Sequence, residues 1–490
     1  MQGMPWFRWD ATRAGVLLAV VGLGATASVG AQTMSYRLHY AKAGEAFIHV
    51  SLVPSTPLPA PRVLVVPRAI PMGYGEASYD ESMEELHAFD SSGAPLSVSR
   101  DDGPRWRLGN EGEAVARVEY QVNLARMERA ILAASDASRV RGGYLSLLGY
   151  SVCAYIDGLD TAAIRLEVEG PPGWPVLTTL APADTGAAPR RASAADYYAL
   201  ADSQVVMGPG MHVRRIESAV PLTVVVYAEA EADVDSVAEL AGVALRRAAT
   251  YFGTVPFSHY TVIQEFLKPV SPAHRYGFSM EHLDSSTFYL SADTAVSSGS
   301  SPADRRRTLY NYAHHISHAW IPKRAYGEGY YPFTWELTPV VDSIWFSEGF
   351  VQYAAIEAVA AGEADPAEYR RLMLATRFAE PLATMPEFLR QMSLVQLSRV
   401  ASTRYSEDFR TGRSSFARGG LMAAALDDRI RERTAGARSL RDVFRHLMAW
   451  SAEHRRAFRI EELPVLVESA TSVDTRDVFE HWLGPMPARR

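Results

Sequence analysis

The sequence predicts an α+β protein of more than one domain, with a β-sandwich-like domain over residues 32–228 and a mainly helical domain over residues 229–490. Two observations support this prediction. Short runs of β-branched and alternating residues, separated by turn signals, fill the first part. Near Asp233 the apolar residues change to helical spacing, and helical segments then dominate. At 490 residues the chain is long enough for two or three domains with separate cores.

The first part alternates predicted strands with turns such as Ser91-Ser92-Gly93. The clearest strands are expected at 47–53, 63–66, 115–120, 164–168 and 222–227. A loop rich in Ala, Pro and Arg, residues 181–195, interrupts this pattern. The single cysteine, Cys153, lies in a run of strand character and cannot form an intrachain disulfide. We expect it to be a small buried apolar residue.

The second part is expected to begin with a helix over 233–251 and a short strand over 260–266. No internal repeat, heptad pattern or low-complexity tract interrupts it. Further helices are predicted at 302–320, 342–362, 366–378, 419–434, 439–450 and 475–483.

The N-terminus has the features of a signal peptide spanning residues 1–31. Arg8 and Arg13 precede an apolar run over 15–25, and Val29-Gly30-Ala31 provides small residues before a cleavage site. The apolar run is short for a membrane span, and no cysteine follows it to carry a lipid. We therefore expect a periplasmic or secreted protein without a stable membrane anchor.

The overall charge argues against nucleic acid as a partner. The formal net charge is −7, so the basic patch typical of nucleic-acid binding is not expected. About half of the residues are apolar (48%) and 21% are charged, which is ordinary for a globular protein.

A candidate zinc site lies on the helix predicted at 302–320. Ser301 can cap this helix and Pro302 suits its first position. His314 and His318 are four residues apart, so both can face one ion. Such a pair alone is more often a polar helix face than a ligand pair.

Glu348 is the candidate third ligand. It follows Trp345-Phe346-Ser347, thirty positions after His318, within an apolar stretch where a charge needs a strong partner. Two histidines and one carboxylate form a common catalytic zinc set that leaves a fourth position for water. Upstream, the segment 276–282 ends in Glu281-His282.

This ordered set of motifs resembles the glycyl aminopeptidase family of thermolysin-like (gluzincin) zinc metallopeptidases. The family has a Gly-Gly-Leu-Glu-His loop, a His-Glu-x-x-His helix followed by Trp, and a third ligand thirty residues on. The similar stretches are Ala195 to Ser203, Tyr251 to Tyr260, Trp320 with Lys323-Arg324, Gly419 to Leu421 and Ser439 to Val443.

The resemblance implies a thermolysin-like second domain that binds Zn²⁺ through His314, His318 and Glu348. It also implies that Glu281 and His282 bind the substrate, a peptide or protein N-terminus with a small first residue. Many family members add a C-terminal PDZ domain, which we do not expect in this chain.

Two positions depart from the family pattern. His315 stands where the family has the glutamate that acts as general base, and Phe416 stands where it has a tyrosine that stabilises the oxyanion. A weakly active or inactive, peptide-binding protein (a pseudoenzyme) is the expected result. The alternative is an active zinc aminopeptidase in which neutral His315 serves as the base.

Two further interpretations are less well supported. A structural protein that has lost the metal would not be expected to keep all three ligand types at the family spacing. A serine hydrolase would need a closing glycine in the segment 149–153, where Cys153 stands instead.

Overall fold

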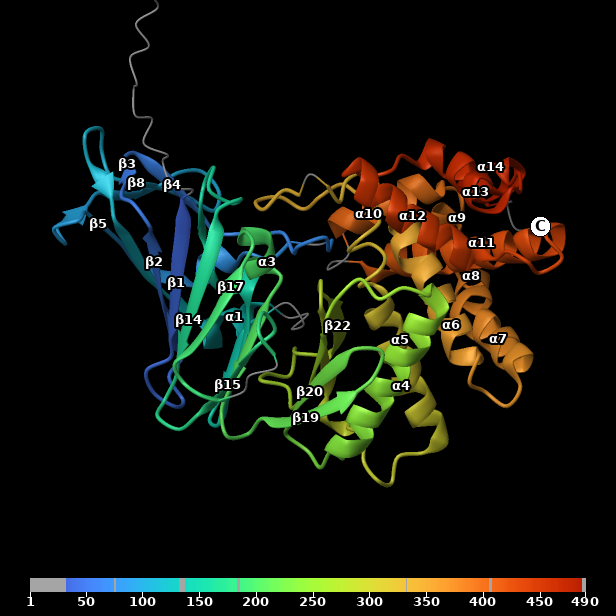
Figure 1. Ribbon diagram of the computed structural model, residues 1–490, viewed down its shortest axis with the longest axis horizontal. Helices are drawn as coiled ribbons and strands as arrows, with labels where there is room; N and C mark the ends of the chain where they lie inside the picture. The colour runs from blue at the N-terminus through green and yellow to red at the C-terminus, as the bar shows by residue number, and fades with distance from the viewer. Residues whose placement is uncertain are drawn as a thin grey trace, which may run out of the picture.

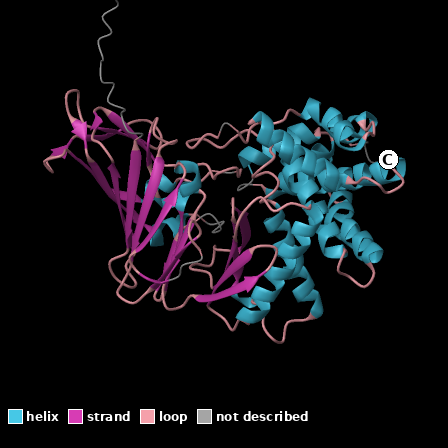
Figure 2. Cartoon of the chain, in the orientation of Figure 1, coloured by secondary structure: helices cyan, strands magenta, loops and turns pink. Residues whose placement is uncertain are grey.

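The computed structural model describes residues 32–74, 76–131, 137–182, 186–331, 333–404 and 408–486. Figure 1 shows a β-rich first part, coloured blue to green, beside a second part in which helices dominate. Figure 2 shows the same division, with most strands on one side and most helices on the other. The predicted α+β architecture is confirmed. The predicted signal peptide, residues 1–31, lies outside the described residues.

The largest sheet of the first part has seven strands. In spatial order they are β17 (Arg190–Ala194), β14 (Ala163–Glu169), β1 (Thr33–His39), β2 (Phe47–Pro54), β10 (Arg117–Asn123), β5 (Met83–Phe89) and β6 (Pro95–Leu96). Burial alternates along β1, β2 and β10, so one face of the sheet is apolar and packs into the core. This pattern is typical of a sheet covered on one side, as in a sandwich.

Smaller sheets and short helices cover that apolar face. One sheet has the order β11 (Arg139–Arg141), β12 (Tyr144–Leu148), β18 (Gln204–Met207), β15 (Pro175–Thr178) and β16 (Gly186–Ala187). Another has the order β13 (Tyr155–Ile156), β4 (Arg62–Val65), β8 (Arg105–Leu108) and β7 (Val98–Arg100), and β3 (Leu58–Pro59) pairs with β9 (Ala114–Val115). The helices are α1 (Leu124–Ala130), α2 (Gly149–Val152) and α3 (Tyr197–Ala201).

Cys153 lies in the core between these sheets, as expected. Its thiol is buried, and burial raises the pKa of Cys153 to about 12. A nucleophilic thiolate is therefore disfavoured at this position.

The second part begins with a five-stranded sheet. Its order is β19 (His212–Glu217), β20 (Pro221–Ala228), β21 (Tyr260–Leu267), β23 (Ser285–Ser291) and β22 (Gly277–Glu281). β20 pairs in parallel with β21. A division placed after residue 228 would cut this sheet, whereas one before β19 follows the strand pairing. A local sequence pattern predicts a strand but not the sheet that the strand joins, which explains why the predicted division falls after β20 and not before β19.

The helices of the second part cover the sheet and form a bundle beyond it. They are α4 (Val234–Phe252), α5 (Pro302–Ser317), α6 (Val351–Ala360), α7 (Pro366–Leu374), α8 (Glu380–Ala383), α9 (Glu387–Arg390), α10 (Leu394–Arg404), α11 (Phe409–Arg433), α12 (Leu440–His454), α13 (Leu463–Thr471) and α14 (Arg476–Leu483). A π-helical stretch, Trp345–Phe350, leads directly into α6. Within the described residues, no helix combines the length and apolar character needed to cross a membrane.

The helices of the second part differ from the predictions in two ways. α11 begins at Phe409 rather than at residue 419. The helices α8, α9, α10 and α13 lie outside the predicted segments. The small residues at the start of α11, among them Gly412 and Ser414, resemble a helix-breaking loop in the sequence. In the structure they are buried, because the helix packs closely there.

Ion pairs, one of them fully buried, tie the first part to the second. Arg139 of β11 lies 2.5 Å from Glu265 of β21, and Arg141 lies 2.7 Å from Glu229. Arg139 and Glu265 are both fully buried, so separating them would leave uncompensated charges. The first part is thereby held against the sheet whose edge strand, β22, ends at Glu281.

Candidate metal centre

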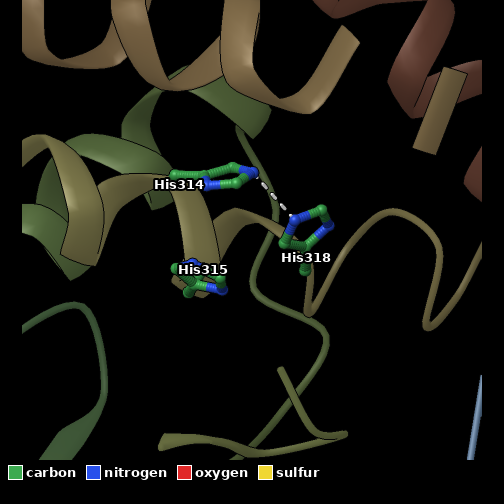
Figure 3. A group of neighbouring side chains, drawn as sticks. All are labelled: His314, His315 and His318. Atoms are coloured by element: carbon green, nitrogen blue, oxygen red, sulfur yellow. Dashed lines mark hydrogen bonds between the residues drawn. The ribbon is translucent and has the colours of Figure 1, made fainter. Parts of the chain in front are cut away.

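Two histidines of the α5 region bring their ring nitrogens together. His314 lies in the last turn of α5 and His318 caps its C-terminus. Their Nε2 atoms are 2.9 Å apart, and Figure 3 shows the two ring edges pointing toward each other, joined by a dashed line. The start of α5 is fixed by the Ser301 side chain, which accepts a hydrogen bond from the Asp304 amide, and by Pro302 in the first turn.

Glu348 meets both histidines. Its Oε2 atom lies 3.3 Å from His314 Nε2 and 3.7 Å from His318 Nε2. A tetrahedral zinc with bonds of about 2.0–2.1 Å has ligand atoms about 3.3 Å apart. The three observed separations, 2.9, 3.3 and 3.7 Å, surround that value. The donor set therefore fits zinc in both chemistry and spacing.

Close packing places Glu348 in this position. The π-helical stretch presses against α11, where a Cβ added to Gly349 would lie 2.6 Å from the Gly419 backbone. A Cβ added to Gly419 would meet Trp345 O at 2.0 Å. The two glycines allow an approach that no larger residue permits. π-Helical segments within helices are frequent at functional sites.

A side chain of the first part also reaches the centre. The Tyr74 hydroxyl donates a short hydrogen bond to Glu348 Oε1, the oxygen that does not face the histidines. Hydrogen bonds of this kind orient metal-ligating carboxylates. No sequence pattern singled out Tyr74, because its loop is far from the motifs in the chain.

Glu281 and His315 lie next to the three candidate ligands. Glu281 Oε2 is 3.7 Å from His315 Nδ1, a separation longer than a hydrogen bond. Ligand atoms of Glu281, His318 and Glu348 lie within 4.8 Å of one another, and so do those of His314, His315 and His318. The structure thus brings five titratable side chains together: the three candidate ligands, Glu281 and His315.

The other two predicted site residues lie outside this cluster. His282 is buried, and its ring nitrogens face Asp202 Oδ1 at 3.2 Å and Thr287 Oγ1 at 3.3 Å. Lys323 Nζ also contacts Asp202, at 3.1 Å. Phe416 is buried in α11 within a small apolar cluster against which Tyr74 packs. Its ring offers no hydrogen-bond donor.

The buried charges of the centre shift one another's pKa values. Burial lowers the pKa of His314, and the neighbouring imidazole of His315 lowers it further, to about 3. Burial also acts to lower the pKa of His318, but the carboxylates of Glu281 and Glu348 outweigh it and raise that pKa to about 9. His314 is thus neutral and ready to bind a metal, whereas His318 must first lose a proton.

Glu281 is held in its charged form. Burial would raise its pKa, but the charge of His318 and the contact with His315 outweigh burial and lower the pKa of Glu281 to about 2. Near neutral pH the group is therefore a carboxylate inside a buried centre. Perturbed pKa values of this kind are frequent at functional sites.

Comparison with known proteins agrees with this architecture. Residues 35–209 match the Peptidase M61 N-terminal domain. An aminopeptidase N family protein from Idiomarina loihiensis is similar in structure, with a TM-score of 0.80 and 19% identity over 93% of this chain and 77% of that one. No curated protein matches the sequence.

Two M1 zinc metallopeptidase structures are more distant. A variant of the Deinococcus radiodurans enzyme bound to Tyr-Ser-Ala has a TM-score of 0.53 at 16% identity, covering 94% of this chain and 96% of that one. A two-domain M1 enzyme bound to L-arginine has a TM-score of 0.52 at 16% identity, covering 94% and 95%. These findings support the resemblance to the gluzincin aminopeptidases: residues 35–209 are similar to the M61 N-terminal domain, and the chain has the two-domain fold of the M1 zinc metallopeptidases.

Proposed function

We propose that this protein is an exported zinc-binding relative of the aminopeptidases that holds peptide or protein N-termini and hydrolyses them slowly or not at all. The observation that carries this proposal is a ligand set with zinc spacing beside a base position that holds His315. Zinc, when bound by His314, His318 and Glu348, would supply a Lewis acid that polarises a carbonyl or water.

Glu281 is the group proposed to receive the substrate's α-ammonium. Its carboxylate lies at the end of edge strand β22, next to the candidate ligands, and its lowered pKa keeps it charged. A charge-assisted hydrogen bond between ammonium and carboxylate is strong in such a buried place. We assign His282 a positioning role, because Asp202 and Thr287 hold its ring and thereby orient the adjacent Glu281.

The low rate follows from the two substitutions. Loss of a general base typically costs about 10²–10⁴ in rate. Loss of an oxyanion donor costs about 10²–10³. Neither His315 nor Phe416 restores the lost chemistry, since imidazole beside a dication resists protonation and a phenyl ring cannot donate.

An active aminopeptidase with His315 as base is the alternative. The observation in its favour is the 3.7 Å separation between His315 Nδ1 and Glu281 Oε2, since a nearby carboxylate can orient a histidine base and stabilise its protonated form. In that case the peptide ammonium would compete with His315 for Glu281.

Metal analysis and peptide binding test the proposal together. The purified protein should hold one zinc per chain, bind short peptides with a free N-terminus more tightly than acetylated ones, and show little hydrolysis of alanyl or glycyl anilides. Glu281→Gln should abolish the preference for a free N-terminus, whereas Glu380→Gln, on the exposed surface of α8, should not. Rapid zinc-dependent hydrolysis by the unmodified protein would favour the alternative.

A further inference from the structure

We infer that His315 is itself a zinc ligand, which closes the metal's coordination shell with His314, His318 and Glu348. This inference rests on the proposed function for the other three ligands. It gives the substitution at position 315 a second consequence besides the loss of a general base. The His315 imidazole would occupy the coordination position that a water molecule takes in an active site, so no water would remain at the metal to be activated.

The geometry supports a three-histidine site. One ring nitrogen from each of His314, His315 and His318 lies within 4.8 Å of the others, and all three residues come from one helix end (Figure 3). The His315 ring centroid is 4.6 Å from that of His314 and 5.8 Å from that of His318. Since the ligand atoms of a zinc tetrahedron are about 3.3 Å apart, side-chain rotations that bring the His315 ring closer to the other two would complete the shell.

The surroundings of His315 also suit a ligand. Its ring packs against the Phe288 ring in a T-shaped arrangement, with the ring centroids 5.5 Å apart and the planes at 87°, which limits its orientation. Its Nδ1 atom is buried and has no hydrogen-bond partner among the described residues. A buried polar atom without a partner is costly, and a metal bond or a metal-driven rotation would remove that cost.

Glu281 fits the role of an outer partner better than that of fourth ligand. Zinc-bound histidines usually donate their second ring N–H to a carboxylate, which orients the ring. Glu281 Oε2 already lies 3.7 Å from His315 Nδ1, so one ring nitrogen of His315 could bind the metal and the other could contact Glu281. Glu281 and His315 would then act together.

A closed shell has a direct functional consequence. Catalytic zinc sites keep an open position for water or substrate, whereas structural sites use four protein ligands. With His315 bound, neither water nor a scissile carbonyl could reach the metal. The protein would then bind zinc tightly, hold peptide ends beside it and leave them intact.

Cobalt substitution of the full chain separates an open shell from a closed one. The visible spectrum of the Co²⁺ protein reports coordination number, and X-ray absorption of the Zn²⁺ protein counts imidazole ligands. We expect three imidazoles and a four-coordinate spectrum that a small hydroxamate does not change. His315→Ala should open one position, so that the spectrum responds to hydroxamate.

Metal affinity gives a second measurement. Zinc competition against a chelator should show a loss for His315→Ala larger than the roughly 10–100-fold typical of an outer-shell partner. His315→Gln keeps the side chain's size and should show a comparable loss, which separates ligation from packing. His481→Ala, at an exposed position of α14, should leave the affinity unchanged, and circular dichroism should confirm that each variant folds.

Three outcomes would overturn the inference. Two imidazoles with a hydroxamate-sensitive spectrum in the unmodified protein would leave the three-ligand zinc site intact but exclude His315 from it. Two metal ions per chain would indicate a dinuclear centre instead. No metal binding by the unmodified protein would refute the three-ligand proposal as well.

Discussion

Removing the Tyr74 hydroxyl tests whether the first part of the chain helps to build the metal centre. In Tyr74→Phe the ring remains and only the donor to Glu348 Oε1 is lost. The carboxylate would then keep the oxygen that faces His314 and His318 but lose its orientation. We expect the fold to survive, because Tyr74 is only partly buried and its ring is retained.

The size of the effect follows from that single contact. A hydrogen bond to a charged group contributes about 1.5–3 kcal/mol. At about 1.4 kcal/mol per tenfold change, its loss corresponds to roughly 10–150-fold weaker zinc binding. This agrees with the 10–100-fold typical of a lost outer-shell partner.

Zinc competition with a fluorescent chelator at constant pH and ionic strength measures this change directly. Tyr331→Phe is the matched control, since Tyr331 is an exposed tyrosine of the second part, 53% accessible. If Tyr74→Phe binds zinc within about threefold of the unmodified protein while Tyr331→Phe is also unchanged, the proposed support of Glu348 by Tyr74 is wrong.

Three further predictions concern catalysis, protonation and packing. The double variant His315→Glu with Phe416→Tyr should raise the rate of hydrolysis of an alanyl anilide by a factor of at least about 10², because it returns a base and an oxyanion donor. No gain in rate despite bound zinc would contradict this prediction. The pKa of His318 is raised to about 9, so His318 must release a proton to bind metal. Apparent zinc affinity in the chelator assay should therefore rise about tenfold per pH unit from pH 6 to 8. A flat profile would refute the assignment of His318 as a ligand that is protonated before the metal binds. Gly349→Ala should lower the free energy of unfolding, measured in urea, by about 1–3 kcal/mol, since the added Cβ would lie 2.6 Å from the Gly419 backbone. Unchanged stability would show that α11 can move away from the π-helical stretch.

The sequence alone determined the parts of the site that depend on local geometry. An α-helix places residues four apart on one face, so the spacing of His314 and His318 is sufficient to pair them. Ser301 and Pro302 likewise predicted where that helix begins, as the structure confirms. The change from strand to helical periodicity near Asp233 predicted the two-part architecture, because periodicity is also a local property of the sequence.

Only the tertiary structure decided which distant residues meet. The contact between Tyr74 and Glu348 joins positions 274 residues apart, and no local pattern encodes it. The orientation of His282 toward Asp202 depends in the same way on packing between the two parts. Glu281 and His282 are neighbours in sequence but face different surroundings, because successive side chains at a strand end point in opposite directions. Periodicity gives the direction of a side chain relative to its own element, whereas the position of that element against another is set by the packing of the whole core.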